Sequence, residues 1–146
     1  MEKEKLIAYC GLYCGDCHGY KGKVADLARD LRKELRESKY KNFADYVGQT
    51  SFGKSFQDYD RCYEVLGAMV KFRCKKGCKD GGGNPFCKIR KCCEKKSFSG
   101  CWECGEFENC EKLKFLEGVH GNAHLKNIRI IKKKGTKEFI KGKRYW

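Results

Sequence analysis

The sequence predicts a mainly α protein, a small helical protein with an irregular, loop-rich, metal-stabilised and cysteine-rich centre. Apolar residues recur at helical spacing within about 20–72 and again within 111–146. Eight of the twelve cysteines fall between these regions, in 74–110. Because 146 residues are enough for one domain, we expect 1–146 to form a single metal-binding domain.

The helical part of the chain opens with an amphipathic pattern over 23–37. Apolar side chains recur there at helical spacing, and charged side chains fill the other face. The apolar positions are Val24, Leu27, Ala28, Leu31 and Leu35. The pattern predicts one helix of about four turns.

Two further helices are predicted before the cysteine-rich centre. A short one is expected around 43–47, and a longer one over about 58–72, with Asp58 as a candidate N-cap. The side chains expected to face inward from the longer helix are Tyr59, Cys62, Tyr63, Leu66, Met69 and Val70. A free cysteine on such a stripe behaves as a small hydrophobe, so we interpret Cys62 as a core residue.

The centre, 74–110, is expected to need metal to become ordered. Glycines at 77 and 81–83 and a proline at 85 interrupt regular structure. So polar a segment cannot bury enough apolar surface to offset its ordering entropy. Metal–thiolate bonds are the available alternative, because a structural zinc contributes on the order of 10 kcal/mol in apparent terms.

The C-terminal part is predicted to return to helix. One helix is expected over about 111–117, with Gly118 as its end. Another is expected over about 123–134, capped by Asn122 and stopped by Gly135, which leaves a tail.

The termini and hydropathy predict a cytoplasmic protein with no membrane partner. The charged N-terminus lacks the apolar run of a signal peptide, and no segment approaches the ~20 apolar residues of a membrane helix. Thiols stay reduced in the cytosol, so clustered cysteines there are metal ligands or catalytic thiols more often than disulfides.

The cysteines fall into short-spaced pairs that suit metal binding. Two thiolates must reach one ion at ~2.3 Å each, which requires a tight turn between them. The pairs are Cys14 with Cys17, Cys74 with Cys78, Cys87 with Cys92, and Cys101 with Cys104. The first and last have the C-x2-C spacing of zinc knuckles. Four pairs supply ligands for two zinc ions.

Proximity in sequence suggests how the pairs combine. One site would use Cys87, Cys92, Cys101 and Cys104, and the other would join the pairs at 14/17 and 74/78. A cross-braced arrangement remains open, and either Cys10 or Cys110 could replace a ligand. Cys93 directly follows Cys92, and because adjacent side chains point apart, at most one of the two is expected to face a given metal.

Iron–sulfur chemistry is the alternative to zinc. Cys10, Cys14 and Cys17 have the C-x3-C-x2-C spacing of radical S-adenosylmethionine enzymes. Such enzymes resemble a partial α/β barrel, which needs a longer chain with alternating strands and helices. The same three cysteines plus a distant one could nevertheless hold a [4Fe–4S] cluster, because all-cysteine sites suit both zinc and iron.

The order of the cysteine motifs resembles a known family. The motifs are IAYCGLYCGDC, CKKGC before a glycine-rich turn, CKIRKC, CWEC and a final Cys110. A similar pattern marks an uncharacterised, cysteine-rich family of bacteria and archaea, catalogued as a domain of unknown function and presumed to bind zinc. The resemblance implies no activity. It implies ligand roles for Cys10, Cys14, Cys17, Cys74, Cys78, Cys87, Cys92, Cys101, Cys104 and Cys110, with Cys62 and Cys93 as additions.

The chain is strongly basic, with 33 Lys and Arg against 19 Asp and Glu, a net charge of +14. Much of this charge lies in the C-terminus, where Tyr145 and Trp146 add stacking surfaces. This pattern favours binding of RNA or DNA, and the alternative is a solvated helix face with a basic tail. The candidate contacts are Lys126, Arg129, Lys132, Lys133, Lys134, Lys141, Lys143 and Arg144.

No catalytic motif accompanies these features. The sequence has no Ser-His-Asp order, no phosphate-binding loop and no paired carboxylates in context. We interpret His120 and His124 as surface residues, and His18 as a neighbour of a metal site rather than a ligand. The expected function is therefore that of a zinc protein acting through binding rather than catalysis. The alternative is an Fe–S protein in electron transfer or redox sensing, and the oligomeric state is left open.

Overall fold

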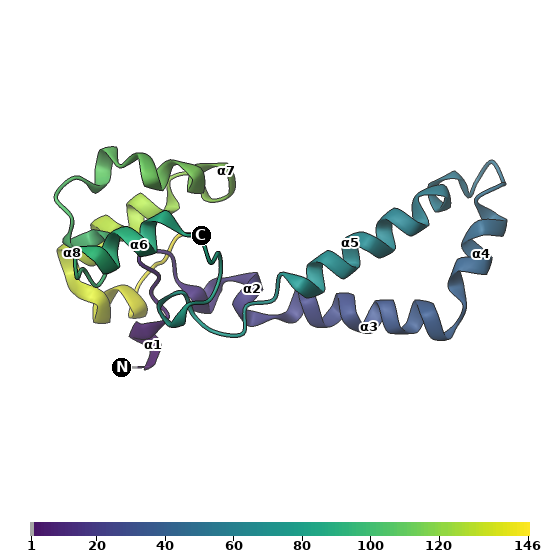
Figure 1. The fold of residues 1–146 in the computed structure, drawn as a ribbon, viewed down its shortest axis with the longest axis horizontal. Coiled ribbons are helices and arrows are strands. Elements are labelled where there is room, and N and C mark those ends of the chain that lie inside the picture. Colours follow the sequence, from purple (N-terminus) through teal and green to yellow (C-terminus); the bar gives the residue numbers. More distant parts are fainter. Residues whose placement is uncertain (1) are drawn as a thin grey trace. The chain divides into compact units, whose positions relative to one another are not determined.

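The computed structural model describes residues 2–146, which form eight α-helices joined by turns and short 3-10 segments (Figure 1). The helices are α1 (Glu2–Lys5), α2 (His18–Lys21), α3 (Lys23–Glu37), α4 (Tyr40–Val47), α5 (Tyr59–Lys71), α6 (Lys88–Lys95), α7 (Glu117–His120) and α8 (Ala123–Lys141). The only β-type pairing in these residues is an isolated bridge between Ile7 and Tyr13. The predicted mainly α class is confirmed.

Contacts divide the chain into two compact units. The hairpin unit comprises Lys21–Arg73, and the cysteine unit joins residues 2–20 to Cys74–Trp146. Every cysteine except Cys62 belongs to the cysteine unit. Within residues 2–146, no helix is both long enough and apolar enough to cross a membrane.

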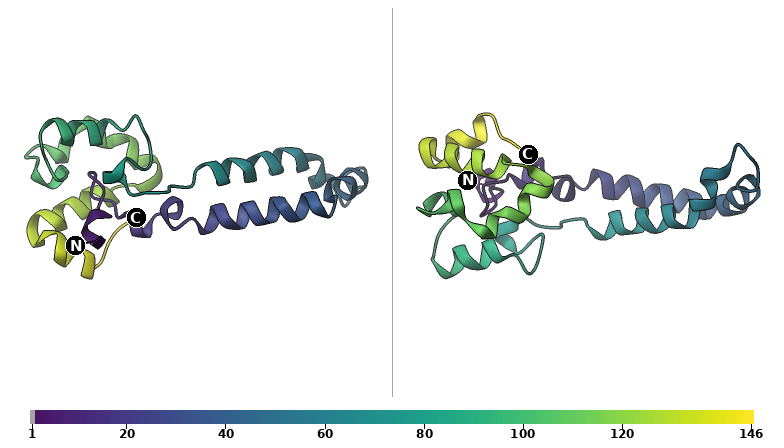
Figure 2. Two further views of the ribbon diagram at one scale, coloured as in Figure 1. Left: turned by 60° about the horizontal axis from the view of Figure 1, so that its bottom comes forward. Right: turned by 90° about the horizontal axis from the view of Figure 1, so that it is seen from above.

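The hairpin unit packs α3 beside α5, with α4 between them in the chain (Figure 2). The residues buried on these two helices are small, namely Ala25, Ala28 and Gly67. Their size lets the helices approach closely. Both helices keep their predicted bounds to within one residue, because a strong helical period is the most dependable local signal.

The expectations for the longer helix α5 hold only in part. Asp58 stands at the predicted N-cap position, but its side chain makes no capping hydrogen bond. Cys62 and Met69, which were expected to face inward, are both exposed. The hairpin has only two long helices, so much of each apolar stripe has no neighbour to pack against.

The cysteine unit contains the main hydrophobic core. Ile7, Ile128 and Phe139 are fully buried, and Ile89 and Trp102 pack in the same cluster. These residues come from the N-terminus, the centre and the C-terminus of the chain. The core therefore ties together the segments that carry the cysteines.

Regular structure extends further through the cysteine unit than the sequence predicts. The centre contains the helix α6, whose Ile89 and Cys93 are buried. Near the C-terminus, the helix expected over about 111–117 is instead a 3-10 segment, Glu111–Leu116, followed directly by α7. Gly118 does not end it, because α7 continues to His120 and stops before Gly121, where φ is 52°. No side-chain hydrogen bond from Asn122 caps α8.

Gly135 interrupts α8 but does not end it. Its φ of 82° is a left-handed value that favours glycine, and helical structure resumes beyond it as far as Lys141. The resumed helix carries Phe139, which is fully buried. Burial of this side chain explains why the predicted tail folds back into the core.

Candidate metal centre

The N-terminal cysteines lie on a tightly turned loop. The Ala8 amide donates to the Leu12 carbonyl (2.8 Å), and the Cys14 amide donates to the Leu6 carbonyl (2.7 Å). Gly11 sits at the turn with φ of 81°, and a Cβ there would lie 2.8 Å from Ile128 Cγ1. The loop is therefore held against α8.

Both C-x2-C pairs form the same local structure. A 3-10 turn begins at the first cysteine, and the amide of the second donates back to its carbonyl, at 3.0 Å for Cys17 to Cys14 and 3.1 Å for Cys104 to Cys101. The closing residues Cys17 and Cys104 are both extended. This matched geometry is the tight turn expected of the two knuckles.

A first thiol group forms around the N-terminal knuckle. The Cys78 amide donates to Cys14 Sγ at 3.5 Å, and the Cys74 amide donates to the Gly19 carbonyl at 3.0 Å. Burial raises the pKa of the Cys14 thiol, and the charges of Cys78, Cys17 and Cys74 raise it further. The pairs at 14/17 and 74/78 therefore lie in one neighbourhood, and their predicted grouping on one metal stays a prediction.

Cys10 and Cys87 also border the first thiol group. Burial raises the pKa of Cys10 to about 12, and the thiols of Cys78, Cys87 and Cys14 contribute to the increase. Burial also raises the pKa of Cys78, with Cys87 again a neighbour. Cys87 thus lies within electrostatic reach of this group, whereas its sequence spacing suggested a site with Cys92, Cys101 and Cys104. We define the first thiol group as Cys10, Cys14, Cys17, Cys74, Cys78 and Cys87, and Cys10 also lies within electrostatic reach of Cys101.

A second thiol group surrounds a small cavity of about 30 Å³. A volume of this size holds one water or ion. The cysteines that line it, which we define as the second thiol group, are Cys92, Cys93, Cys101, Cys104 and Cys110. Cys93 Sγ lies 3.8 Å from Cys101 Sγ. Two thiolates on one tetrahedral zinc at ~2.3 Å would be separated by about the same distance.

The electrostatics of the second group centre on one sulfur pair. The hydrogen bond between the two sulfurs lowers the pKa of Cys93 and raises that of Cys101, because the pair shares a proton more easily than it loses two. The sequence left open whether Cys92 or Cys93 would face a given metal, and the family resemblance implied no ligand role for Cys93. Its spacing four residues after Ile89, on the inner face of α6, was the available signal.

The donor chemistry of both groups fits a thiophilic metal. Sites made of several neighbouring cysteine sulfurs suit zinc or an iron–sulfur cluster, and they do not suit hard cations such as magnesium. Across the described residues, however, no three His, Cys, Asp or Glu side chains are already gathered as a coordination cage. The structure brings the predicted cysteines into two neighbourhoods without fixing a ligand set.

Arg90 organises the loop between the two groups. It is only 8% exposed. Its guanidinium donates to the carbonyls of Cys78 (3.0 Å), Gly82 (2.8 Å) and Asn84 (2.7 Å). The planar guanidinium of arginine has five N–H donors and suits binding of several carbonyls at once, whereas the ammonium of lysine does not. Sequence reasoning missed Arg90, although a single arginine among lysines in CKIRKC is a usable signal.

Replacing Arg90 should therefore destabilise the cysteine unit. We expect Arg90→Lys to lower the free energy of unfolding by about 2–4 kcal/mol, because at least one buried carbonyl loses its donor. Urea unfolding followed by circular dichroism measures the change. Arg61→Lys is the matched control, because Arg61 is 81% exposed and pairs only with Glu64. Equal midpoints for the two variants would contradict the role given to Arg90.

The three histidines differ from one another in burial. His18 is exposed, whereas His124 is buried, which corrects the surface position expected for His124. Neither ring nitrogen of His124 has a hydrogen-bond partner among the described residues. Burial lowers the pKa of both His120 and His124. His120 packs edge-on against Trp146, with ring centroids 4.8 Å apart.

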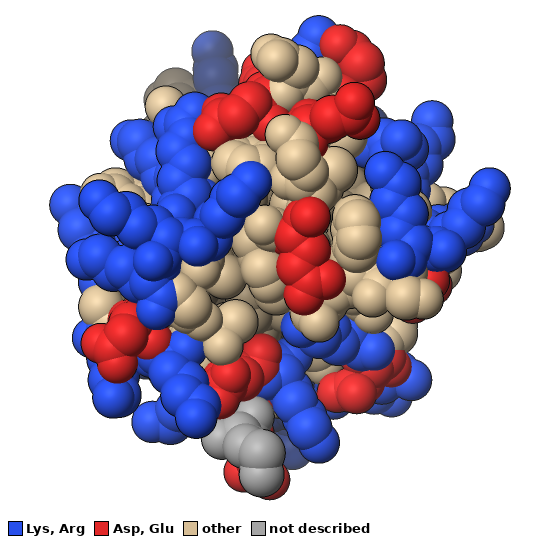
Figure 3. All heavy atoms as spheres, turned by 90° about the vertical axis from the view of Figure 1, so that its left-hand side faces the viewer, with Lys and Arg blue, Asp and Glu red and all other residues tan. Residues whose placement is uncertain are grey.

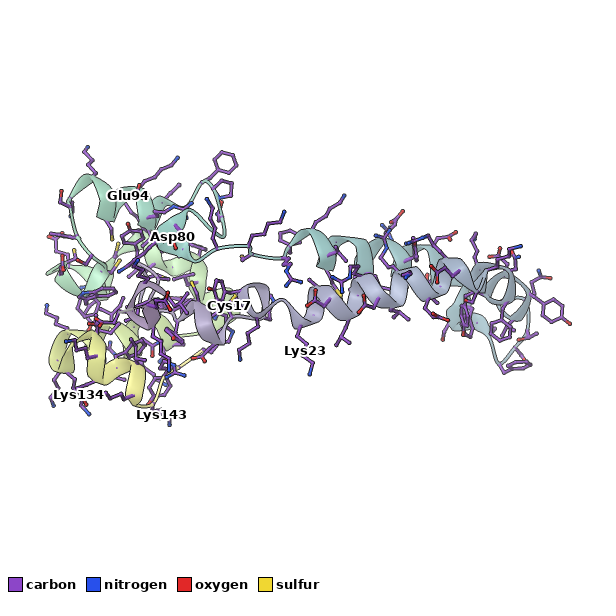
Figure 4. The ribbon with its side chains drawn as sticks, turned by 90° about the horizontal axis from the view of Figure 1, so that it is seen from below. Cys17, Lys23, Asp80, Glu94, Lys134 and Lys143 are labelled. Carbon is purple, nitrogen blue, oxygen red and sulfur yellow. The ribbon has the colours of Figure 1, made fainter. Side chains whose placement is uncertain are left out.

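The basic C-terminus is largely engaged in contacts within the unit. Arg129 pairs with Glu108 at 2.5 Å, and Arg144 pairs with Asp16 at 2.7 Å. Lys141 pairs with Glu138, Lys132 covers the Phe107 ring, and Lys126 and Lys143 cover Tyr145. Of the eight predicted contacts, Lys133 and Lys134 have neither an ion pair nor an aromatic partner in the described part of the chain. Lys134 lies on α8, and Lys143 lies just beyond the end of that helix (Figure 4).

A second basic surface lies on α6. A groove of about 560 Å³ is lined by Cys92 and by five lysines, with no carboxylate among its lining residues. We call this the lysine groove, and its lysines are Lys88, Lys91, Lys95, Lys96 and Lys112. None of them forms an ion pair within residues 2–146. On the face drawn in Figure 3, Lys and Arg gather on both sides and Asp and Glu lie between them.

Fold and site together define a small helical, cysteine-rich protein with two thiol groups in one unit. The sequence profile of a family described as "Protein of unknown function (DUF3795)" matches residues 6–115, and the chain belongs to this family. The predicted membership of an uncharacterised family is thus confirmed, while the match does not test the cysteine pattern. No curated protein and no solved structure matches the chain.

Proposed function

We propose that the cysteine unit is a metal-stabilised module that binds nucleic acid. Two structural zinc ions, one for each thiol group, would hold the centre of the chain in place. The lysine groove beside the second thiol group would then contact phosphates. The observation that carries the binding proposal is the groove itself, which concentrates five lysines without a carboxylate.

The zinc proposal rests on the donor set and its local geometry. Thiolates are the preferred ligands of structural zinc, and four of them close the coordination sphere. The separation of 3.8 Å between Cys93 Sγ and Cys101 Sγ fits two ligands of one ion. A closed all-thiolate site leaves no position for a reacting water, which favours a structural role over catalysis.

The binding proposal rests on charge and on shape. Lysines at positions 88, 91 and 95 recur on one face of α6 and are joined at the groove by Lys96 and Lys112. A concave surface of one sign favours a polyanion, and backbone phosphates present a regular row of charges. The C-terminal residues predicted for this role are weaker candidates, because several are already paired.

Charge reversal separates the two surfaces. The test variant carries Lys91→Glu, Lys95→Glu and Lys112→Glu in the full chain, and the matched control carries Lys133→Glu, Lys134→Glu and Lys137→Glu. We expect the test variant to lose about 100-fold or more in affinity for labelled oligonucleotides at ~50 mM salt, because three phosphate contacts become repulsive. Fluorescence anisotropy measures the affinity. Equal losses in both variants, or no binding by the natural chain, would overturn the proposal.

An Fe–S protein in electron transfer or redox sensing is the second candidate. The observation that favours it is that Cys10, with its C-x3-C-x2-C spacing, lies near the thiols of Cys14, Cys78 and Cys87. Protein purified without oxygen distinguishes the metals. Brown colour, a broad absorption near 400 nm and iron by elemental analysis would replace zinc with a cluster. A colourless protein with about two zinc ions per chain supports the zinc module.

A further inference from the structure

The lysine groove and the cavity of the second thiol group share a wall. Cys92, Lys96 and Lys112 line both spaces. Cys92 lies on α6, and Lys96 directly follows the end of that helix. Lys112 lies on the 3-10 segment Glu111–Leu116, which packs against α6. The groove is therefore formed by two segments of the chain, and the second thiol group lies where those segments meet.

Cysteines of the second thiol group lie on α6 and beside the segment that carries Lys112. Cys92 and Cys93 belong to α6, and Cys110 directly precedes the 3-10 segment. A metal held by this group would link the two segments, because its thiolate ligands would come from both. Loss of that metal would remove the link, and the lysines of α6 would no longer share one concave surface with Lys112.

Two sulfurs of the group are placed to react with each other. Cys93 Sγ and Cys101 Sγ are 3.8 Å apart, and no other two cysteine sulfurs within residues 2–146 are in hydrogen-bond contact. Backbone hydrogen bonds hold both residues: the Phe98 amide donates to the Cys93 carbonyl (2.9 Å), and the Cys101 amide donates to the Tyr9 carbonyl (2.8 Å). A disulfide bond is about 2.05 Å long, so the sulfurs need to approach by less than about 2 Å.

We propose that hydrogen peroxide oxidises Cys93 and Cys101 to a disulfide, which releases the metal of the second thiol group and thereby weakens the binding of nucleic acid by the lysine groove. This regulation rests on the proposed function, because it needs both the metal and the groove to act as proposed there.

The chemical step is a two-electron oxidation of the sulfur pair. One sulfur, as a thiolate, attacks one oxygen of the peroxide; the O–O bond breaks, and the other oxygen leaves and takes up protons to become water. The second sulfur then attacks the resulting sulfenic acid, an S–S bond forms, and the remaining oxygen leaves as a second water. Each sulfur gives up one electron, and the peroxide accepts both.

The disulfide would remove two ligands from a site that needs four. Five cysteines line the cavity, so three thiols would remain, one too few to close the coordination of zinc. Size selects the oxidant, because Cys93 and Cys101 are buried and the cavity between the cysteines is only about 30 Å³. A peroxide suits a space of about one water better than a bulky disulfide such as oxidised glutathione does.

Mass spectrometry of the natural chain tests the chemical step. Zinc-loaded protein is treated with ~1 mM hydrogen peroxide, the remaining thiols are alkylated, and tandem spectra of the unreduced peptides assign the linked sulfurs. We expect a disulfide between Cys93 and Cys101 and the release of about one zinc per chain. The same concentration of oxidised glutathione should release little zinc. A first disulfide between other cysteines, or a Cys93–Cys101 disulfide without zinc release, would overturn the proposal.

Oligonucleotide binding by the same samples tests the regulation. At ~50 mM salt, fluorescence anisotropy should show that the oxidised chain binds about tenfold or more weakly, and that dithiothreitol with zinc restores the affinity. Cys62→Ser is the matched control and should respond as the natural chain does, because Cys62 is exposed in the hairpin unit.

The outcomes separate this regulation from the function on which it rests. A reduced chain that binds neither zinc nor oligonucleotide would refute the proposed function, and the regulation with it. A reduced chain that binds both, and keeps its affinity for the oligonucleotide once the Cys93–Cys101 disulfide has formed, would overturn the regulation alone. Loss of the response in Cys62→Ser, or a loss of binding that dithiothreitol and zinc do not reverse, would also overturn it.

Discussion

Chelation of the two proposed zinc ions is expected to melt most of the helical structure of the cysteine unit. A structural zinc site contributes on the order of 10 kcal/mol in apparent terms. The net stability of a whole domain is only about 5–15 kcal/mol. Loss of two such sites would therefore exceed the stability that the hydrophobic core around Ile128 and Phe139 supplies alone. Circular dichroism before and after a strong chelator, with elemental analysis of both samples, measures the effect.

A pair of cysteine variants provides the matched test. Cys101→Ser should lose about one metal equivalent per chain and should melt well below the natural protein, because the Cys101 side chain lines the cavity of the second thiol group and its sulfur lies 3.8 Å from Cys93 Sγ. Cys62→Ser should keep its full metal content, since Cys62 is exposed in the hairpin unit. Unchanged helicity and melting after complete metal removal would show that metal does not stabilise the fold.

The acid dependence of metal content follows from the same thiols. Metal binding requires thiolates, and burial raises the pKa of Cys10 and Cys14 in the metal-free protein. Binding must therefore displace protons, and affinity should fall as the pH is lowered. The measurement that checks this coupling is the release of protons when zinc is added to the metal-free chain in a weakly buffered solution.

Local sequence patterns predicted the bounds of the helices better than they predicted what the helices pack against. The bounds of α3 and α5 follow from a strong helical period, which depends only on nearby residues. The predicted burial of Cys62 was wrong because an apolar stripe shows which side of a helix is apolar, and not whether another element covers that side. The return of the chain to helix after Gly135 depends on the burial of Phe139 in a core that distant segments create.

The candidate site shows the same division between local and distant information. Short spacings predicted the two knuckle turns, because a two-residue gap leaves few ways to aim both sulfurs at one ion. The neighbourhood of Cys87 depends on how the 78–84 loop is folded, and Arg90 holds that loop through three carbonyls. No spacing rule reveals such a contact.

Binding of nucleic acid through the lysine groove is expected to be steep in salt. Each phosphate neutralised on duplex DNA contributes about −0.9 to the slope of log affinity against log salt, so five lysines give a slope of about −4.5. Affinity should then fall about 500-fold between ~50 and ~200 mM salt, with a slope of about −3.5 on single strands.

The salt dependence of the variants also shows which surface binds the phosphates. Lys91→Glu, Lys95→Glu and Lys112→Glu together should reduce its magnitude by about 2.7 on duplex DNA, because three phosphate contacts are lost. The variant at Lys133, Lys134 and Lys137 should keep the natural slope. Anisotropy titrations at several salt concentrations measure both values, and metal content should be the same in all three proteins. A natural slope shallower than about −1, or one that only the second variant alters, would mean that the lysine groove does not bind phosphates.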